Sequence, residues 1–340
     1  MSREKVYSAT VEKIEVLDGD GSDDPELNDE ELHEIYRQMM VARKFDEKAF
    51  KLQRRGEIST YAPHKGQEAA QIGTVFAMND EDWMVPSFRE TAAFIARGAP
   101  LDKLFQRWMG DVRGQADLER ELPVAVPVGS QNLQTAGVGM AMNKQDEDNA
   151  VVGFTGDGST SEGDFHEALN FASVYDAQTV FIVQNNQYAI SMPSDKQTGS
   201  ETFAQKGLGY GIHCLQVDGN DVLAVITALR EVLEKAREGE PVLVEAVTYR
   251  IEDHTTSDNS TRYRDDEEVE KWKEYDPIDR LKQYMKDNGS WDDSLEEFEE
   301  KAKEKVQEAA EKSMEVDEPT VDDMFDYVYG ELPPNLQKQK

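Results

Sequence analysis

Two short stretches decide the fold, Ala150-Val-Val-Gly-Phe-Thr-Gly-Asp-Gly158 and Val180-Phe-Ile-Val-Gln-Asn-Asn186. Each is an apolar run that ends in glycine, aspartate or asparagine, which is typical of a buried strand followed by a turn. Residues 165–174 between them have a helical pattern, and the connection has about the length that one right-handed βαβ crossover needs. We therefore expect two neighbouring parallel strands joined by a helix.

Further strands and helices alternate on both sides of this pair. The patterns predict strands at 83–86 and 242–249 and helices at 28–52, 134–142 and 223–236. Strands that alternate with helices favour a mostly parallel sheet whose two faces are covered by helices. We therefore predict an α/β fold.

The chain is long enough for one large domain, since 38% of its 340 residues are hydrophobic. We expect that domain at 28–315 and an acidic N-terminal tail at 1–27. Residues 316–340 regain aromatic content after the charged run at 296–313. Such a change is typical of a segment that docks on a core or a partner.

The charge balance is strongly acidic, with 70 Asp and Glu residues, 37 Lys and Arg residues and a net charge of −33. Such a surface repels DNA, RNA and anionic lipid, so neither nucleic acid nor a membrane is an expected partner. The apolar runs at 180–183 and 242–247 argue against a disordered acidic protein. Because concentrated salt screens surface repulsion, this composition resembles that of proteins from salt-loving microbes, and we expect a halophilic source.

The expected cellular location rests on features that the sequence does not contain. Cys214 is the only cysteine, and the charged first thirty residues have no apolar segment of the kind that a signal peptide needs. No apolar stretch approaches the roughly 20 residues of a membrane-spanning helix. We therefore expect a cytoplasmic protein.

The turns after the two central strands carry the chemistry. In a parallel sheet these turns lie side by side at the carboxyl edge, where open α/β sheets bind ligands. Asp157 and Asn186 are then able to share one ion. Carboxylate and amide oxygens suit Mg²⁺ whose shell is completed by phosphates, and Gly156 and Gly158 let the backbone approach those phosphates closely.

A dinucleotide-binding fold is the competing interpretation. Gly156-x-Gly158-x-x-Ser161 lacks the third Gly or Ala of that fingerprint. An Asp inside the turn would also repel a pyrophosphate that brings no cation. A metal ion removes that repulsion, so we favour a site for a metal and a diphosphate.

The pairing of Gly156-Asp-Gly158 with Asn185-Asn186 resembles the thiamin diphosphate signature. The stretch 156–172 resembles the alpha subunits of the first component of pyruvate and branched-chain 2-oxo acid dehydrogenase complexes. Four more stretches resemble that family in the same order, namely 61–73, 128–131, 184–191 and 254–264. The resemblance covers about 32–334 and implies the thiamin-diphosphate-binding fold.

This resemblance implies thiamin diphosphate and Mg²⁺ as cofactors. Magnesium would be bound by Asp157, Asn186 and the carbonyl of Tyr188. The residues that would contact the rest of the cofactor are Phe88, where relatives often have Tyr, and Arg89, Val126, Val128, Gly156, Gly158, Ser159 and His254. Among them, Val128 would support the bent thiamin, and backbone groups near Val126 would meet its aminopyrimidine.

Two histidines are candidates for catalysis. The resemblance places His254 near the diphosphate and the reacting centre, as a proton donor or an anchor for intermediates. His64 falls near the position of an active-site histidine in certain relatives, although Ala62 occupies the matching site, and a packing role is the alternative. The segment Gly110-Asp-Val-Arg-Gly114 lacks the histidine pair that some relatives carry there.

The implied reaction is oxidative decarboxylation of a 2-oxo acid with transfer of the acyl group to a lipoyl-bearing acyltransferase. In this family a beta subunit supplies the carboxylate beside the aminopyrimidine, so we expect an α2β2 heterotetramer and no activity from this chain alone. Residues 61–73 look like those of bacterial pyruvate enzymes, whereas 249–258 look like those of branched-chain enzymes. Pyruvate is the favoured substrate, with branched-chain 2-oxo acids close behind.

Two other functions remain open at this point. The cofactor-binding half of a split transketolase would also carry Gly156-Asp-Gly158 and the asparagine pair. A noncatalytic acidic scaffold would have 156–186 as an ordinary βαβ unit and would bind partners through its charged C-terminal helices. The scaffold would bind neither thiamin diphosphate nor magnesium.

Overall fold

The computed structural model describes residues 9–19, 24–115, 119–326 and 329–340. Parts of the three expected segments therefore lie outside the described residues, namely 1–8 and 20–23 of the acidic tail, 116–118 of the large domain and 327–328 of the docking segment.

The two central strands form as predicted. β3 (Val151–Gly156) and β4 (Thr179–Asn185) are parallel neighbours, and α6 (Gly163–Val174) connects them. Gly156 pairs in register with Gln184, so the turns that follow both strands lie at the same edge of the sheet.

All six strands of the main sheet are parallel, in the order β1-β7-β8-β4-β3-β2. β2 (Trp83–Val85) and β8 (Val242–Val247) match predicted strands. The patterns did not predict β7 (His213–Asp218) or β1 (Glu12–Ile14). β1 lies in the stretch expected to be an acidic tail and pairs with β7, so part of that stretch completes the sheet.

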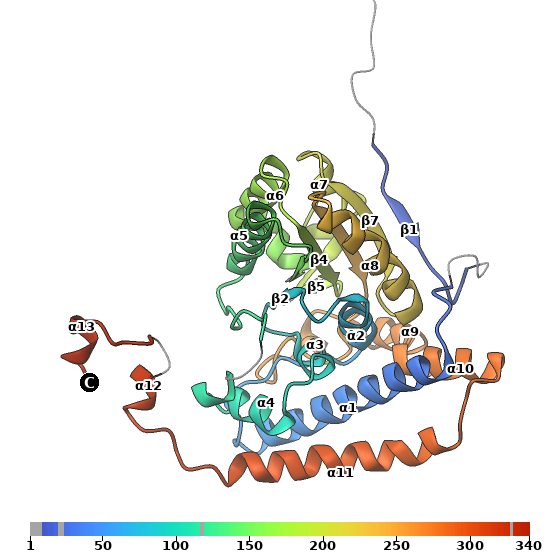
Figure 1. The fold of residues 1–340 in the computed structure, drawn as a ribbon. Coiled ribbons are helices and arrows are strands. Elements are labelled where there is room, and N and C mark those ends of the chain that lie inside the picture. Colours follow the sequence, from blue (N-terminus) through green and yellow to red (C-terminus); the bar gives the residue numbers. More distant parts are fainter. Residues whose placement is uncertain (1–8, 20–23, 116–118, 327–328) are drawn as a thin grey trace, which may run out of the picture.

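Helices cover both faces of the sheet (Figure 1). One face carries α8 (Val222–Arg237), against which α2 (Glu68–Ala77) packs, and the other carries α5 (Ser130–Gln145) with α6 beside it. α1 (Asp29–Arg54) lies farther from the sheet, packed against α2, α3 (Thr91–Ala96) and α11 (Ser294–Met314). The apolar side chains of β4 explain why both faces are covered, because they alternate between two hydrophobic cores. Val180 and Ile182 pack in the core on one face, and Phe181 and Val183 pack in the core on the other. The predicted α/β architecture is confirmed.

The remaining elements connect or flank this core. The helices are α3 (Thr91–Ala96), α4 (Leu101–Trp108), α7 (Gln205–Leu208), α9 (Asp266–Lys273), α10 (Pro277–Asn288), α11 (Ser294–Met314), α12 (Asp323–Asp326) and α13 (Pro334–Gln337). The 3₁₀ turns are η1 (Val112–Gln115), η2 (Asp157–Ser161), η3 (Ser194–Lys196) and η4 (Ser260–Arg262), and a small hairpin pairs β5 (Tyr188–Ala189) with β6 (Met192–Pro193).

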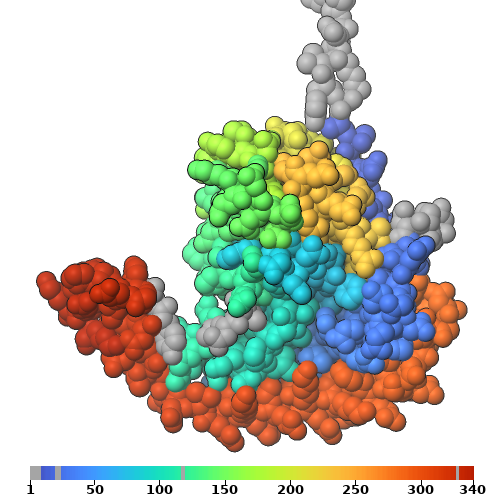
Figure 2. Space-filling view, viewed as in Figure 1, coloured from blue at the N-terminus to red at the C-terminus, as the bar shows by residue number. Residues whose placement is uncertain are grey.

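The charged C-terminal run forms α11, which lies along α1 (Figure 1). Beyond α11 the chain leaves the body of the molecule, and Figure 2 shows α12 and α13 projecting from it. This projecting segment exposes Val321, Met324 and Tyr329. Within the described ranges, no helix has the length and apolar character needed to cross a membrane.

Candidate functional site

A cavity of about 280 Å³ lies at the carboxyl edge of β3 and β4. Most of the residues that the sequence singled out line it, namely Phe88, Arg89, Val128, Gly156, Asp157, Gly158, Ser159, Asn186, Tyr188 and His254. It is also lined by residues that were not singled out, namely Gln67, Ser87, Glu90, Glu162, Gln184, Ala189 and Ile190. Neither Val126 nor His64 lines it.

The turn after β3 presents a buried carboxylate to the cavity. Asp157 is 2% exposed, and one of its oxygens accepts a hydrogen bond of 2.6 Å from Nε2 of Gln197. Burial raises the pKa of the Asp157 carboxyl, while the hydrogen bond from Gln197 and the charge of Arg250 oppose that rise. A carboxylate in this position is stabilised when a cation binds next to it.

The two glycines of this turn have different structural roles. A Cβ atom on Gly158 would lie 2.6 Å from the Cβ of Ala189 in β5, so any side chain there would push the hairpin away. A Cβ atom on Gly156 would meet no protein atom within 4 Å. Gly158 is therefore required by packing, whereas Gly156 leaves open space beside the backbone for a ligand.

The two asparagines after β4 also differ. Asn185 donates from Nδ2 to Glu245 at 2.8 Å and so ties β4 to β8. Asn186 donates from Nδ2 to Oε1 of Gln67 at 3.1 Å. Its Oδ1 is buried and has no hydrogen-bond partner among the described residues. Asn186 thus offers a free acceptor at the cavity, as a metal ligand would.

Tyr188 brings a third oxygen to this edge. Its backbone carbonyl accepts a hydrogen bond of 3.3 Å from Arg250, and its hydroxyl donates to Glu268 at 2.8 Å. Gln187, which precedes it, has a φ of 75°, a left-handed conformation that turns the chain sharply after the strand. A carboxylate, an amide oxygen and a carbonyl form a hard donor set that fits Mg²⁺ when phosphate oxygens complete its shell.

His254 lies between two buried guanidinium groups. Its Nδ1 accepts hydrogen bonds from Arg89 at 3.2 Å and from Arg250 at 3.1 Å. Burial and the charges of both arginines lower the pKa of His254 to about 3. The ring is therefore neutral, and its proton is on Nε2.

The same pair of arginines makes this side of the cavity electropositive. Burial and the nearby charge of Arg250 lower the pKa of Arg89 to about 10, which is the expected response of one cation held close to another. Arg89 also donates to the carbonyls of His254, at 3.0 Å, and of Pro63, at 2.5 Å. Two guanidinium groups held in this way favour a bound anion such as a diphosphate.

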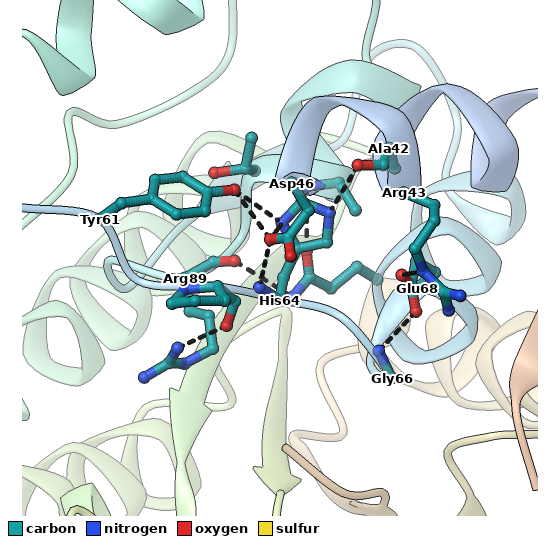
Figure 3. A network of polar contacts seen from close by, with 12 residues as sticks. Ala42, Arg43, Asp46, Tyr61, His64, Gly66, Glu68 and Arg89 are labelled. Carbon is teal, nitrogen blue, oxygen red and sulfur yellow. Dashed lines mark hydrogen bonds and ion pairs between the residues drawn. The ribbon is translucent and has the colours of Figure 1, made fainter. Parts of the chain in front are cut away.

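His64 is fully buried and takes part in the network of Figure 3. Its Nδ1 lies 3.1 Å from the carboxylate of Asp46, and its Nε2 lies 3.2 Å from the carbonyl of Ala42. Tyr61 donates to the same carboxylate at 2.9 Å. These contacts attach the turn that contains Pro63 to α1, and the carbonyl of Pro63 accepts a hydrogen bond from Arg89. This arrangement corresponds to the packing role that was the alternative for His64.

Part of the cavity lining is exposed and apolar. Val128 is 51% exposed and Ile190 is 55% exposed, and both line the cavity. Val126 is 72% exposed and Met192 is 48% exposed nearby along the same two segments of chain. We call these four residues the apolar rim. Exposed apolar side chains grouped beside a polar pocket do not stabilise a monomer. Such a group is typical of a surface that a partner covers.

Comparison with known proteins bears on this arrangement. A family model described as Dehydrogenase E1 component matches residues 36–322. The chain belongs to this family. The 3-methyl-2-oxobutanoate dehydrogenase subunit alpha of Mycobacterium tuberculosis is 42% identical over 98% of this chain and 94% of the relative. The pyruvate dehydrogenase E1 component subunit alpha of Staphylococcus epidermidis is 39% identical over 98% and 94%. Its Staphylococcus aureus counterpart is 38% identical over 96% and 91%.

Membership of the E1 family confirms the resemblance drawn from the sequence and implies thiamin diphosphate as the cofactor. Sequence reasoning missed several buried polar residues at the site, namely Gln67, Glu90, Gln184 and Arg250. Glu90 accepts a hydrogen bond of 2.6 Å from Gln184, and burial raises the pKa of its carboxyl. Only Gln184, a polar residue that follows an apolar run, carried a signal in the sequence; Gln67, Glu90 and Arg250 stand among other polar residues.

Proposed function

We propose that this chain is the alpha subunit of a 2-oxo acid dehydrogenase E1 component, which binds thiamin diphosphate and one Mg²⁺ at the carboxyl edge of β3 and β4. The observation that carries the proposal is that Asp157, with its carboxylate, and Asn186 line the same cavity, and that the amide oxygen of Asn186 has no hydrogen-bond partner among the described residues. Family membership and relatives that span nearly the whole chain support it.

The chain's part in binding is to hold the charged end of the cofactor. Asp157, Asn186 and the carbonyl of Tyr188 would bind the magnesium ion. Arg89, Gly158 and Ser159 would meet the diphosphate, because all three line the cavity and Arg89 supplies positive charge there. A metal-clamped diphosphate on a rigid strand edge fixes the position of the rest of the cofactor.

When bound, thiamin diphosphate supplies the carbon centre that takes up the 2-oxo acid and lets carbon dioxide leave. The chain would contribute the Nε2 proton of His254, which is held in place by the two hydrogen bonds to Nδ1. Val128 would support the thiamin from the exposed part of the cavity lining. His64 would act indirectly, through the turn that holds Arg89.

The partner of the chain would be a beta subunit in an α2β2 heterotetramer. The apolar rim supports this proposal, since a partner there would exclude water and bring the missing carboxylate. The projecting C-terminal segment would dock on the same assembly, which would hand the acyl group to a lipoyl-bearing acyltransferase. We place the protein in the cytoplasm of a halophile, where concentrated salt screens its charge of −33.

Decarboxylation assays test the function and the substrate together. The chain is co-expressed with its candidate beta subunit, and turnover of pyruvate and of 3-methyl-2-oxobutanoate is measured in high salt with thiamin diphosphate and Mg²⁺. We expect turnover only when both chains are present, with pyruvate as the better substrate. Retained magnesium-dependent cofactor binding without turnover would favour a split transketolase, and loss of binding would favour a scaffold.

A further inference from the structure

Gln67 joins the metal side of the cavity to the start of α2. It follows Gly66 directly, is fully buried and lines the cavity. Its Oε1 accepts the hydrogen bond of 3.1 Å from Nδ2 of Asn186. Its own Nε2 is buried and has no hydrogen-bond partner within the described part of the chain.

The two amides leave a matched pair of unused atoms. Once Gln67 and Asn186 have bonded to each other, the remaining groups are an acceptor, Oδ1 of Asn186, and a donor, Nε2 of Gln67. Burying either without a partner costs free energy that a ligand is able to recover. An oxygen atom suits a cation and an N–H group suits an anion, so the pair is complementary to a metal ion and its phosphate.

An unpaired buried atom does not by itself define a site. Gln178 also has a buried Oε1 without a partner among the described residues, yet it precedes β4 at the opposite edge of the sheet. Its Nε2 donates to the carbonyls of Glu147, Asn149 and Arg237, so its role is to join loops. What distinguishes Gln67 is that its partner is Asn186 and that both residues line one cavity.

We propose that Gln67 belongs to the metal and diphosphate site. Its Oε1 holds the Asn186 amide so that Oδ1 faces the magnesium ion, and its Nε2 donates to a phosphate oxygen. The first role is that of a positioning residue and the second is a direct contact. This inference rests on the proposed function, because it assumes that thiamin diphosphate and Mg²⁺ bind here.

Two substitutions separate these roles. Gln67→Met keeps the approximate size of the side chain and removes both polar groups. Gln67→Glu keeps an acceptor for Asn186 and removes the donor, while its negative charge faces the diphosphate. Gln178→Met is the matched control, since it makes the same change at a buried glutamine at the other edge of the sheet.

The experiment is a calorimetric titration of the full-length chain, together with its beta subunit, with thiamin diphosphate at a series of Mg²⁺ concentrations. We expect Gln67→Met to raise the Mg²⁺ concentration needed for half-maximal binding by about 10–100-fold, the usual effect of losing a residue that orients a ligand. Gln67→Glu should keep the magnesium requirement near that of the wild type but bind thiamin diphosphate about tenfold more weakly at saturating Mg²⁺. Gln178→Met should bind like the wild type, although its thermal unfolding temperature without ligand should fall at least as far as that of Gln67→Met, because Gln178 donates to three carbonyls.

Wild-type affinity in Gln67→Met would overturn this role, as would an equal loss of affinity in Gln178→Met. A magnesium requirement in Gln67→Glu that rises as far as in Gln67→Met would overturn the positioning role of Oε1. These results leave the proposed function intact. Failure of the unmodified protein to bind thiamin diphosphate with Mg²⁺ would overturn the proposed function and this role together.

Discussion

The two sides of the cavity differ in how far this chain completes them. On the closed side, Asp157, Asn186 and Arg89 are buried. Asp157 accepts a hydrogen bond from Gln197, Asn186 donates one to Gln67, and Arg89 donates one to the backbone carbonyl of Pro63, which fixes their positions. On the open side, the apolar rim lies exposed beside the same pocket. The difference supports the proposal that the chain forms the metal and diphosphate half of the site and that a partner completes the thiamin half. Cofactor binding and turnover should therefore be separable.

The largest effect is expected on the closed side, from Asp157→Ala. Removing the carboxylate from the proposed magnesium ligands should lower magnesium-dependent affinity for thiamin diphosphate by more than about 100-fold, which exceeds the usual cost of losing a residue that supports a ligand. Calorimetry measures the affinity, and circular dichroism should show unchanged secondary structure. Undiminished affinity would falsify the assignment of Asp157 as a ligand.

Gly158→Ala should give the next largest effect. Its methyl group would overlap the Cβ of Ala189, and relief of that contact by a backbone shift should cost about 1–3 kcal/mol of unfolding free energy without ligand. Gly156→Ala is the control, because its methyl group meets no protein atom and should leave that free energy nearly unchanged. Denaturant unfolding compares the two, and equal losses would contradict the packing role of Gly158.

The contrast between the two sides also separates what the sequence predicted from what it did not. Asp157 and Asn186 were found because each directly follows an apolar strand, and the geometry of parallel strands brings such turns together. Gln67 and Arg250 were missed because they reach the cavity from other parts of the chain through tertiary packing, which leaves no spacing pattern in the sequence. The position of Val126 was implied by the resemblance alone, and its side chain lies outside the cavity lining.

Strand prediction failed for a related reason. β7 has buried apolar residues at Cys214, Leu215 and Val217 between partly exposed polar ones, which is a weaker signal than the unbroken apolar runs of β3 and β4. β1 spans only Glu12–Ile14, and its place is fixed by pairing with β7. The backbone N–H groups of Val16 and Leu17 then donate to Asp221, a contact between distant parts of the chain.

A substitution on the open side should have a smaller effect, and only on assembly. Val126→Asp places a charge on a side chain that is 72% exposed in this chain, so the stability of the chain alone should change by less than about 0.5 kcal/mol. Its affinity for the beta subunit should fall about tenfold, because the charge would be buried under the partner. Val174→Asp, on α6, is the control at another exposed valine. Sedimentation measures assembly with the beta subunit. If Val126→Asp assembles as well as the wild type does, the apolar rim is not part of the interface.

The smallest expected effect concerns His254, where the two sides meet. Its pKa of about 3 in the folded chain lies below that of an unfolded histidine, near 6.5. As pH falls below about 6.5 the unfolded chain takes up a proton that the folded chain does not, so stability is lost, whereas above that pH His254 contributes no pH dependence. At pH 5.5 this loss should be roughly 1 kcal/mol. His254→Asn keeps an acceptor for Arg89 and does not titrate, so its stability should fall less than that of the wild type between pH 7 and 5.5. Parallel curves for the two proteins in denaturant unfolding would mean that the folded chain protonates His254 as readily as the unfolded chain does, and would contradict the lowered pKa.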